Sequence, residues 1–139
     1  MGRILGIDYG ERRIGLAVSD PTGTIAQPLP TLRRRPKQRA PLKRIVEVAR
    51  EYDVEAIVIG LPIETSGREG TQARTVRGFG EALRKRAGLP VEYRDERLTS
   101  ARARREITRM DLPASARRDK ERVDAMAAMF ILQSYLDDR

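Results

Sequence analysis

Acidic residues occur at three places in the chain where an ordinary stabilising role does not call for a carboxylate. Asp8 closes the apolar segment RILGID, Asp95 and Glu96 close the segment VEYRDE, and Asp124 lies inside the apolar run VDAMAAMFIL. Convergent carboxylates are hard oxygen ligands, which suit Mg²⁺ or Mn²⁺. Ions held in this way can stabilise both the attacking and the leaving oxygen of a phosphodiester. The acids therefore predict metal-dependent phosphodiester chemistry, provided that the fold brings them together.

Each acid also has a structural interpretation that the sequence leaves open. Asp8 precedes a glycine-containing turn, where an aspartate often accepts backbone hydrogen bonds. Asp95 or Glu96 could pair with a neighbouring arginine or begin the cap of the next helix. Asp124, expected near the first turn of its helix, could favour the positive end of the helix dipole. Its apolar neighbours predict burial, however, and a buried lone carboxylate is costly unless it is paired or bound to a metal.

The composition narrows the chemistry that this chain can perform. Its 139 residues include no cysteine and no histidine, which excludes disulfides, thiolate or imidazole zinc sites and histidine general bases. Hydrophobic residues make up 40% and charged residues 35%, enough for one folded domain over residues 1–139. No segment approaches the roughly 20 apolar residues that cross a bilayer, and the first residues do not resemble a signal peptide. We therefore expect a cytoplasmic protein.

The charge of the chain indicates a polyanionic partner. The formal net charge is +8 and most of the positive charge is arginine, which forms bidentate contacts with phosphate. A GC-rich genome would explain arginine in place of lysine, but it would not explain the net charge. Nucleic acid is therefore the favoured partner, and an anionic membrane is a distant second.

Hydrophobic patterning predicts the elements that must position the acids. Short strands are expected over residues 3–8, 14–19, 24–32, 55–61 and 91–95, and helices over 41–52, 72–86, 99–110 and 120–136. Pro28 and Pro30 would confine the third strand to an edge, and the near-continuous apolar run at 55–61 is typical of a central parallel strand. The order βββαβαβαα describes an α/β fold that opens with an antiparallel meander. Ends of parallel strands converge on one rim, over which the last helix could place Asp124.

Four segments together resemble a known family. They are GIDYGERRIGLAVSD at residues 6–20, VIGLPIETSGREGTQA at 58–73, DERLTSARA at 95–103 and RVDAMAAMFIL at 122–132. In this order, and over nearly the whole chain, they are similar to the YqgF/RuvX family, bacterial proteins with an RNase H-like fold related to the resolvase RuvC. The resemblance implies a five-stranded mixed sheet with helices on both faces, which agrees with the order read from the pattern.

The resemblance also implies a site and an activity. By similarity, Asp8, Glu96 and Asp124 are the catalytic acids that hold Mg²⁺ or Mn²⁺. Adjacent side chains of a strand point to opposite faces, so only one of Asp95 and Glu96 should face the metal, and we favour Glu96. Members of the family are regarded as nucleases that mature the 5′ end of pre-16S rRNA, and were earlier assigned as Holliday-junction resolvases. The implied partner is structured RNA or branched DNA, bound by a monomer or a homodimer.

Several residues are expected to contact nucleic acid. The glycine-bearing loop at 62–71 leads into a helix whose free N–H groups could hold a phosphate, unless it is only a flexible connection. Tyr9, which follows Asp8, could stack on a nucleotide or pack within the protein. The full set of candidates is Tyr9, Arg12, Arg13, Arg33, Arg34, Arg35, Ser66, Gly67, Gly70 and Arg97.

Two other classes of protein share parts of this pattern. RNase H-like domains can lose catalysis and keep a basic surface, so a non-catalytic nucleic-acid-binding module is an alternative. The first motif also resembles the phosphate-binding segment of the actin and sugar-kinase superfamily. Those ATPases enclose their nucleotide between two such domains, and 139 residues supply only one. The presence of all three acids favours a nuclease.

Overall fold

A five-stranded mixed sheet forms the centre of the protein in a computed structural model, which describes residues 2–35, 38–98 and 117–139. The strands, in chain order, are β1 (Arg3–Tyr9), β2 (Arg13–Ser19), β3 (Ala26–Arg33), β4 (Val54–Leu61) and β5 (Val91–Asp95). They lie side by side in the order β3-β2-β1-β4-β5. The first three pair antiparallel, whereas β4 runs parallel to both β1 and β5. The predicted mixed sheet with an antiparallel opening is confirmed.

The position of β3 agrees with its two prolines. Proline has no N–H to donate to a neighbouring strand, so it is tolerated at the edge of a sheet. Both Pro28 and Pro30 lie in β3, which is an edge strand and pairs only with β2. The prediction that these prolines confine the third strand to an edge is confirmed.

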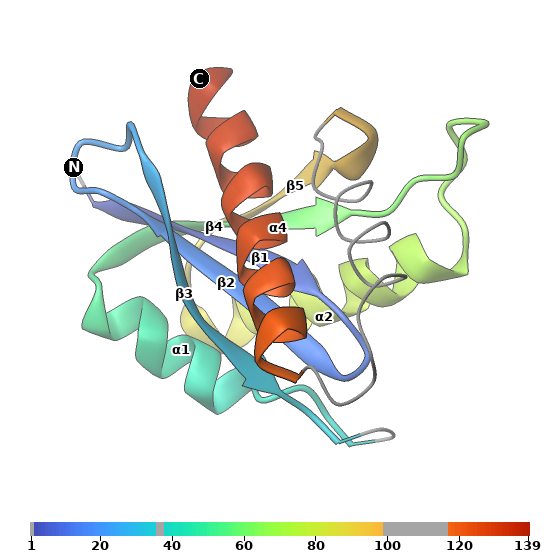
Figure 1. Cartoon of the computed structure of the whole chain (residues 1–139), viewed down its shortest axis with the longest axis horizontal. Helices are drawn as coiled ribbons and strands as arrows, with labels where there is room; N and C mark the ends of the chain where they lie inside the picture. The colour runs from blue at the N-terminus through green and yellow to red at the C-terminus, as the bar shows by residue number, and fades with distance from the viewer. Residues whose placement is uncertain (1, 36–37, 99–116) are drawn as a thin grey trace.

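Helices cover both faces of the sheet (Figure 1). On one face lie α1 (Leu42–Glu51) and α2 (Thr71–Ala87), and on the other lies α4 (Arg117–Asp137). A short 3-10 helix, η1 (Glu96–Leu98), follows β5 directly. The last helix begins before the predicted residue 120. Its first turn is polar, so the apolar pattern used for the prediction did not reveal the start. The helix predicted over residues 99–110 falls on positions outside the described residues.

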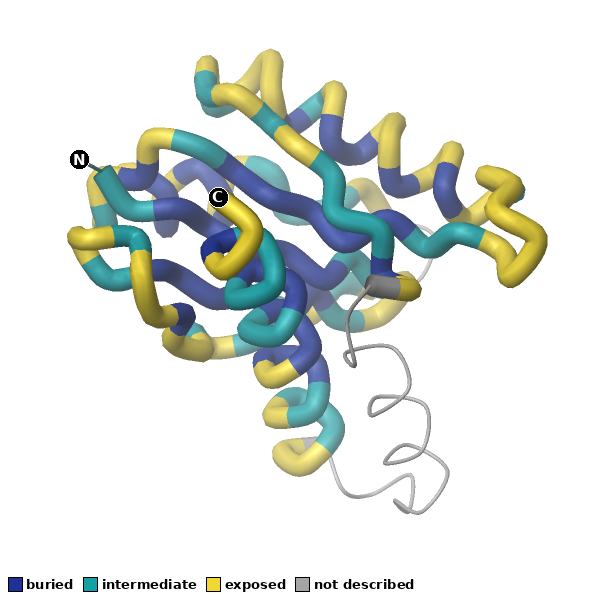
Figure 2. The backbone as a smooth tube through the Cα atoms, turned by 90° about the horizontal axis from the view of Figure 1, so that it is seen from above, coloured by how far each residue is buried: buried dark blue, intermediate teal, exposed yellow. Residues whose placement is uncertain are grey.

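Two hydrophobic cores lie on opposite sides of the sheet. Alternate residues of a strand face opposite sides, so Ile7 of β1 packs under α1 and α2, whereas Ile4 packs against α4. In β4, Ile59 belongs to the first core and Val58 to the second, as predicted for a central strand. Figure 2 shows the central strands as buried and the loop at residues 62–70 as largely exposed.

Two glycines allow α4 to lie close to the sheet. A Cβ atom on Gly6 would lie 2.7 Å from the Cβ of Leu132, and one on Gly15 would lie 2.1 Å from the carbonyl oxygen of Asp124. The contact at Gly15 is with the helix backbone, so no change of rotamer can relieve it. Any side chain at this position would therefore push α4 away from β2.

We expect Gly15→Ala to destabilise the protein by about 1–3 kcal/mol, because α4 must shift to admit the methyl group. Gly78→Ala is the matched control. Gly78 lies within α2 with open space around its Cβ position, so this exchange should stabilise by about 0.5–1 kcal/mol. Urea unfolding followed by circular dichroism measures both effects. Equal effects of the two substitutions would contradict the close approach of α4.

Candidate active site

A pocket of about 510 Å³ opens at the carboxyl ends of the parallel strands. Its walls are residues 8–13, Pro62, Thr71, Gln72, Thr75, Val76 and Glu96. These residues come from the end of β1 through the start of β2, the residue after β4, the first turns of α2 and the residue after β5. Ligands of open α/β sheets usually bind at this rim. Two of the three predicted acids, Asp8 and Glu96, therefore share one pocket.

Asp8 lies near the end of β1 with its side chain toward α4. It follows Ile4 and Gly6 at intervals of two residues, and both of those positions face α4. The residue is only 3% exposed. This burial places the carboxylate at the inner wall of the pocket, where a charge is stable only if it is balanced.

Glu96 reaches the same face of the sheet from another direction. It is the first residue of η1 and is also 3% exposed. A Cβ atom on Gly60 of β4 would lie 2.9 Å from Glu96 Oε1 and 2.5 Å from Cδ1 of Ile131, a residue of α4. The Glu96 carboxylate therefore lies between β4 and α4, on the side of the sheet that Asp8 faces.

Asp95 is directed differently. It pairs in the ladder with Leu61, which belongs to the core under α1 and α2. Its carboxylate accepts the backbone N–H of Arg97 at 2.9 Å and Nη2 of the same residue at 2.8 Å. Hydrogen bonding from Arg97 holds the pKa of Asp95 below its usual value of 3.8. The geometry thus favours Glu96 over Asp95 as a metal ligand, and the alternative that Asp95 pairs with Arg97 is confirmed.

Asp124 lies on α4 and is 1% exposed. Since α4 begins at Arg117, Asp124 lies about two turns into the helix, and the expectation that it lies near the first turn is wrong. The helix dipole acts within that first turn, so it does not account for this residue. The Asp124 carbonyl packs on Gly15, which pairs with Asp8 in the ladder between β1 and β2. Asp124 therefore lies over the sheet at the level of Asp8.

An ion pair holds the Asp124 carboxylate. Nε of Arg13 donates to Oδ2 of Asp124 at 2.5 Å, and the Arg13 side chain is 19% exposed and borders the pocket. Within residues 2–35, 38–98 and 117–139, no three Asp or Glu side chains are gathered closely enough to hold a metal ion. The structure thus brings Asp8 and Glu96 to one pocket and directs Asp124 toward Arg13.

The donor chemistry of these acids fits a hard divalent cation. All three residues are nearly completely buried and lie on the α4 face of the sheet. Burying several carboxylates together is costly unless cations compensate them, and carboxylate oxygen is the ligand that Mg²⁺ and Mn²⁺ prefer. Asp8 and Glu96, which line the same pocket, could hold such an ion.

Tyr9 packs within the protein as well as lining the pocket. Its ring stacks on Phe79 of α2 with ring centroids 4.2 Å apart. The guanidinium carbon of Arg34 lies 5.1 Å from the centre of the Tyr9 ring, and Nη1 of Arg34 donates to the Tyr9 hydroxyl. Because Phe79 and Arg34 engage the ring, the structure favours the packing role that the sequence left open.

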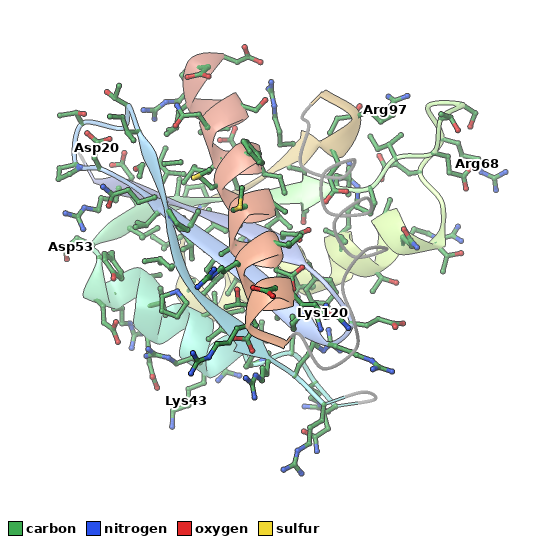
Figure 3. The ribbon with its side chains drawn as sticks, viewed as in Figure 1. Asp20, Lys43, Asp53, Arg68, Arg97 and Lys120 are labelled. Atoms are coloured by element: carbon green, nitrogen blue, oxygen red, sulfur yellow. The ribbon has the colours of Figure 1, made fainter. Side chains whose placement is uncertain are left out.

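The other arginine candidates fall into two groups. Arg12 lines the pocket and Arg35 is exposed after β3, so both are accessible to phosphate. Arg33 instead donates through Nε to Glu121 of α4 at 2.5 Å. Arg97 is engaged by Asp95, although Figure 3 shows it at the end of the molecule where the exposed loop lies.

The glycine-bearing loop at residues 62–70 lies beside the pocket rather than in its wall. Ser66, Gly67 and Gly70 do not line the 510 Å³ pocket. Gly67 has a φ of 90°, which permits the turn in which its N–H donates to the carbonyl of Glu64. Gly70 precedes α2 and borders a smaller hollow of about 350 Å³.

Three polar residues of the pocket were not expected from the sequence. They are Thr71, Gln72 and Thr75, in the first two turns of α2. Thr75 follows Thr71 by four positions and Gln72 by three, spacings that place side chains on one helix face. This spacing directly after a glycine loop is the signal that could have revealed them.

None of the helices in the described part of the chain is long and apolar enough to cross a membrane.

Comparison with protein families and relatives identifies what the chain resembles. Residues 2–138 match a family model described as "RuvX: Holliday junction resolvase". A protein of Roseiflexus sp. (strain RS-1), named "Putative pre-16S rRNA nuclease", is 44% identical over 138 residues, which cover 99% of this chain and 96% of the relative. A protein of the same name from Moorella thermoacetica is 47% identical over 135 residues, covering 97% of this chain and 94% of the relative.

Solved structures confirm the type of fold. Thermus thermophilus RuvC in complex with a Holliday junction substrate has a TM-score of 0.60 and 19% identity, covering 99% of this chain and 96% of that protein. A second T. thermophilus RuvC structure has a TM-score of 0.57 and covers 98% of this chain and 96% of its own. The predicted RNase H-like fold is confirmed.

The geometry of Asp95 and Glu96 predicts unequal roles in metal binding. We expect Glu96→Gln to weaken Mn²⁺ binding about tenfold, because it removes a charged ligand from the pocket. Asp95→Asn is the matched control and should leave the affinity within about twofold, since its carboxylate is engaged by Arg97. Isothermal titration calorimetry measures both. A larger loss from Asp95→Asn than from Glu96→Gln would reverse the assignment.

Proposed function

Since this chain belongs to the RuvX family, we propose that it is a nuclease that hydrolyses phosphodiester bonds with the help of Mg²⁺ or Mn²⁺. One observation carries the proposal: Asp8 and Glu96, both nearly completely buried, line the same pocket as Arg12 and Arg13. Acids that can hold a cation beside arginines that can hold a phosphate form a site for a scissile phosphodiester.

The substrate that we propose is the precursor of 16S rRNA, cut at its 5′ end during ribosome biogenesis. Relatives that are 40–47% identical over nearly the whole chain are named for this substrate. The net charge of +8 supports a polyanionic substrate. Aromatic residues make up only 4% of the chain, which argues against a single-strand reader that relies on base stacking and supports structured RNA. We place the protein in the cytoplasm, where bacterial ribosomes are assembled.

The residues of the site divide the work of hydrolysis. Asp8, Glu96 and Asp124 would hold the ion, which when bound supplies a Lewis acid and a more acidic attacking water. Arg12 lies in the turn after β1 and lines the pocket, where its guanidinium neutralises the negative charge of the bound phosphate. The first turn of α2 offers its N–H groups and the side chains of Thr71 and Gln72 as partners for the sugar-phosphate backbone of the nucleic acid next to the scissile bond. No histidine is required for this division of roles.

Cleavage of a four-way DNA junction is the second candidate function. The family description and the fold shared with RuvC favour it. A resolvase must cut two strands symmetrically, which requires a homodimer, whereas RNA processing can be performed by a monomer. A non-catalytic binding module would have no use for buried carboxylates in its pocket, so the burial of Asp8 and Glu96 favours an enzyme.

We expect Asp8→Asn to reduce Mg²⁺- or Mn²⁺-dependent cleavage by at least about a hundredfold, because the pocket loses a charged metal ligand. Nucleic-acid affinity should change little, since the basic side chains remain. Cleavage of labelled RNA on a denaturing gel and fluorescence anisotropy measure the two quantities.

Asp53→Asn is the matched control for Asp8→Asn. Asp53 has a φ of 52°, which asparagine also tolerates, and Figure 3 shows it at the opposite end of the molecule from Arg97. This variant should cleave at the wild-type rate. Cleavage that survives Asp8→Asn would refute the metal site.

A direct competition decides between RNA and DNA. A pre-rRNA 5′ segment and a four-way DNA junction are offered at the same metal and salt concentrations, because phosphate contacts depend strongly on salt. We expect selective cleavage of the RNA. Symmetric nicking of the junction, together with a dimeric mass in solution, would instead establish the resolvase function.

A further inference from the structure

The ion pair between Arg13 and Asp124 joins two elements at the edge of the pocket. Arg13 begins β2, Asp124 lies on α4, and Nε of the first is 2.5 Å from Oδ2 of the second. The acid is 1% exposed and the arginine side chain 19%. Arg13 also lines the pocket together with Asp8 and Glu96. A cation of the protein itself therefore already occupies one of the three acids proposed to hold a metal ion.

A guanidinium and a divalent ion compete for such a carboxylate. Each needs the oxygen lone pairs at short range, and two cations a few ångströms apart in a poorly solvated site repel each other strongly. In the described ranges, Asp124 does not form a metal-binding group with two other acids. In this arrangement Arg13 is a counter-ion of Asp124.

We propose that Arg13 is a built-in competitor of the metal ion: it holds Asp124 in the metal-free protein and must leave it when the ion binds. This inference rests on the metal site of the proposed function. It makes Arg13 a positioning residue that sets the metal concentration at which the site assembles. Once released, the guanidinium remains beside the pocket, where a phosphate can accept its hydrogen bonds.

A neighbouring ion pair provides an internal comparison. Arg33 of β3 is the ladder partner of Arg13, and its Nε lies 2.5 Å from Oε1 of Glu121, three residues before Asp124 on α4. Both ion pairs therefore join the sheet to α4, and the distance from Nε to the carboxylate oxygen is the same in each. The Arg33 pair differs in being more exposed, at 57% and 23%, and Arg33 does not line the pocket. Only the Arg13 pair should respond to a metal ion.

The first test measures Mn²⁺ affinity by isothermal titration calorimetry in three proteins. Arg13→Gln should bind Mn²⁺ about tenfold more tightly than the wild type, because the competing charge is gone. Arg33→Gln should bind within about twofold of the wild type. Arg13→Lys retains the charge and should restore weaker binding. Unchanged or weaker binding by Arg13→Gln would overturn the proposal, since a purely structural tie would give that result.

A second measurement uses the wild-type protein, because Arg13→Gln removes an ion-pair partner from a buried carboxylate and can impair folding. The Nε–H signals of arginine side chains are recorded by NMR during a titration with Mg²⁺, and the Arg13 signal is assigned by its absence in Arg13→Lys. The Arg13 Nε–H should be protected from solvent exchange at first and lose that protection as the ion binds. The Arg33 signal should not move. Protection of Arg13 that persists at saturating Mg²⁺ would overturn the proposal.

A parallel titration of Asp8→Asn separates this inference from the proposed function. If the wild type binds Mn²⁺ no better than Asp8→Asn does, the metal site itself is refuted, and the role of Arg13 with it. If Asp8→Asn abolishes binding while Arg13→Gln matches the wild type, the metal site stands and only the competition by Arg13 is refuted.

Discussion

The close packing of α4 on the sheet is the constraint on which the site depends. Gly6 and Gly15 leave no room for a Cβ atom beneath this helix, and the Asp124 carbonyl rests directly over Gly15. Gly15 pairs with Asp8 in the β1–β2 ladder. The contact between Gly15 and the Asp124 carbonyl therefore fixes how far Asp124 lies from Asp8. A side chain at Gly15 would move the helix, and Asp124 with it, away from the sheet and from Asp8.

Topology brings the remaining acid to the same place. The central position of β1, between β2 and β4, puts the end of the first strand in the middle of the sheet. Since β4 and β5 run parallel to β1, their carboxyl ends lie at the same rim, and the turn after β5 carries Glu96 there. Asp95 is bonded to Arg97 in this turn, whereas the carboxylate of Glu96 lies on the α4 side of the sheet.

The three buried carboxylates need positive charge close to them, although the protein as a whole is basic. Three carboxylates with at most 3% exposure are destabilising unless cations lie close to them. Arg13 compensates one of them within the fold, and a divalent ion can compensate the set. The formal net charge of +8 favours association of the whole protein with a polyanion.

Residue chemistry and short-range pattern by themselves determined several properties of this protein. The absence of histidine and cysteine, the edge position of the proline-bearing strand and the expectation that Asp95 and Glu96 face opposite ways depend only on residue types and near neighbours. The tertiary structure alone decided the partner of Asp124, the start of α4 and the pocket face of α2. Arg13 and Asp124 are 111 positions apart, and only the packing of a helix on a sheet determines which side chains meet across such a separation.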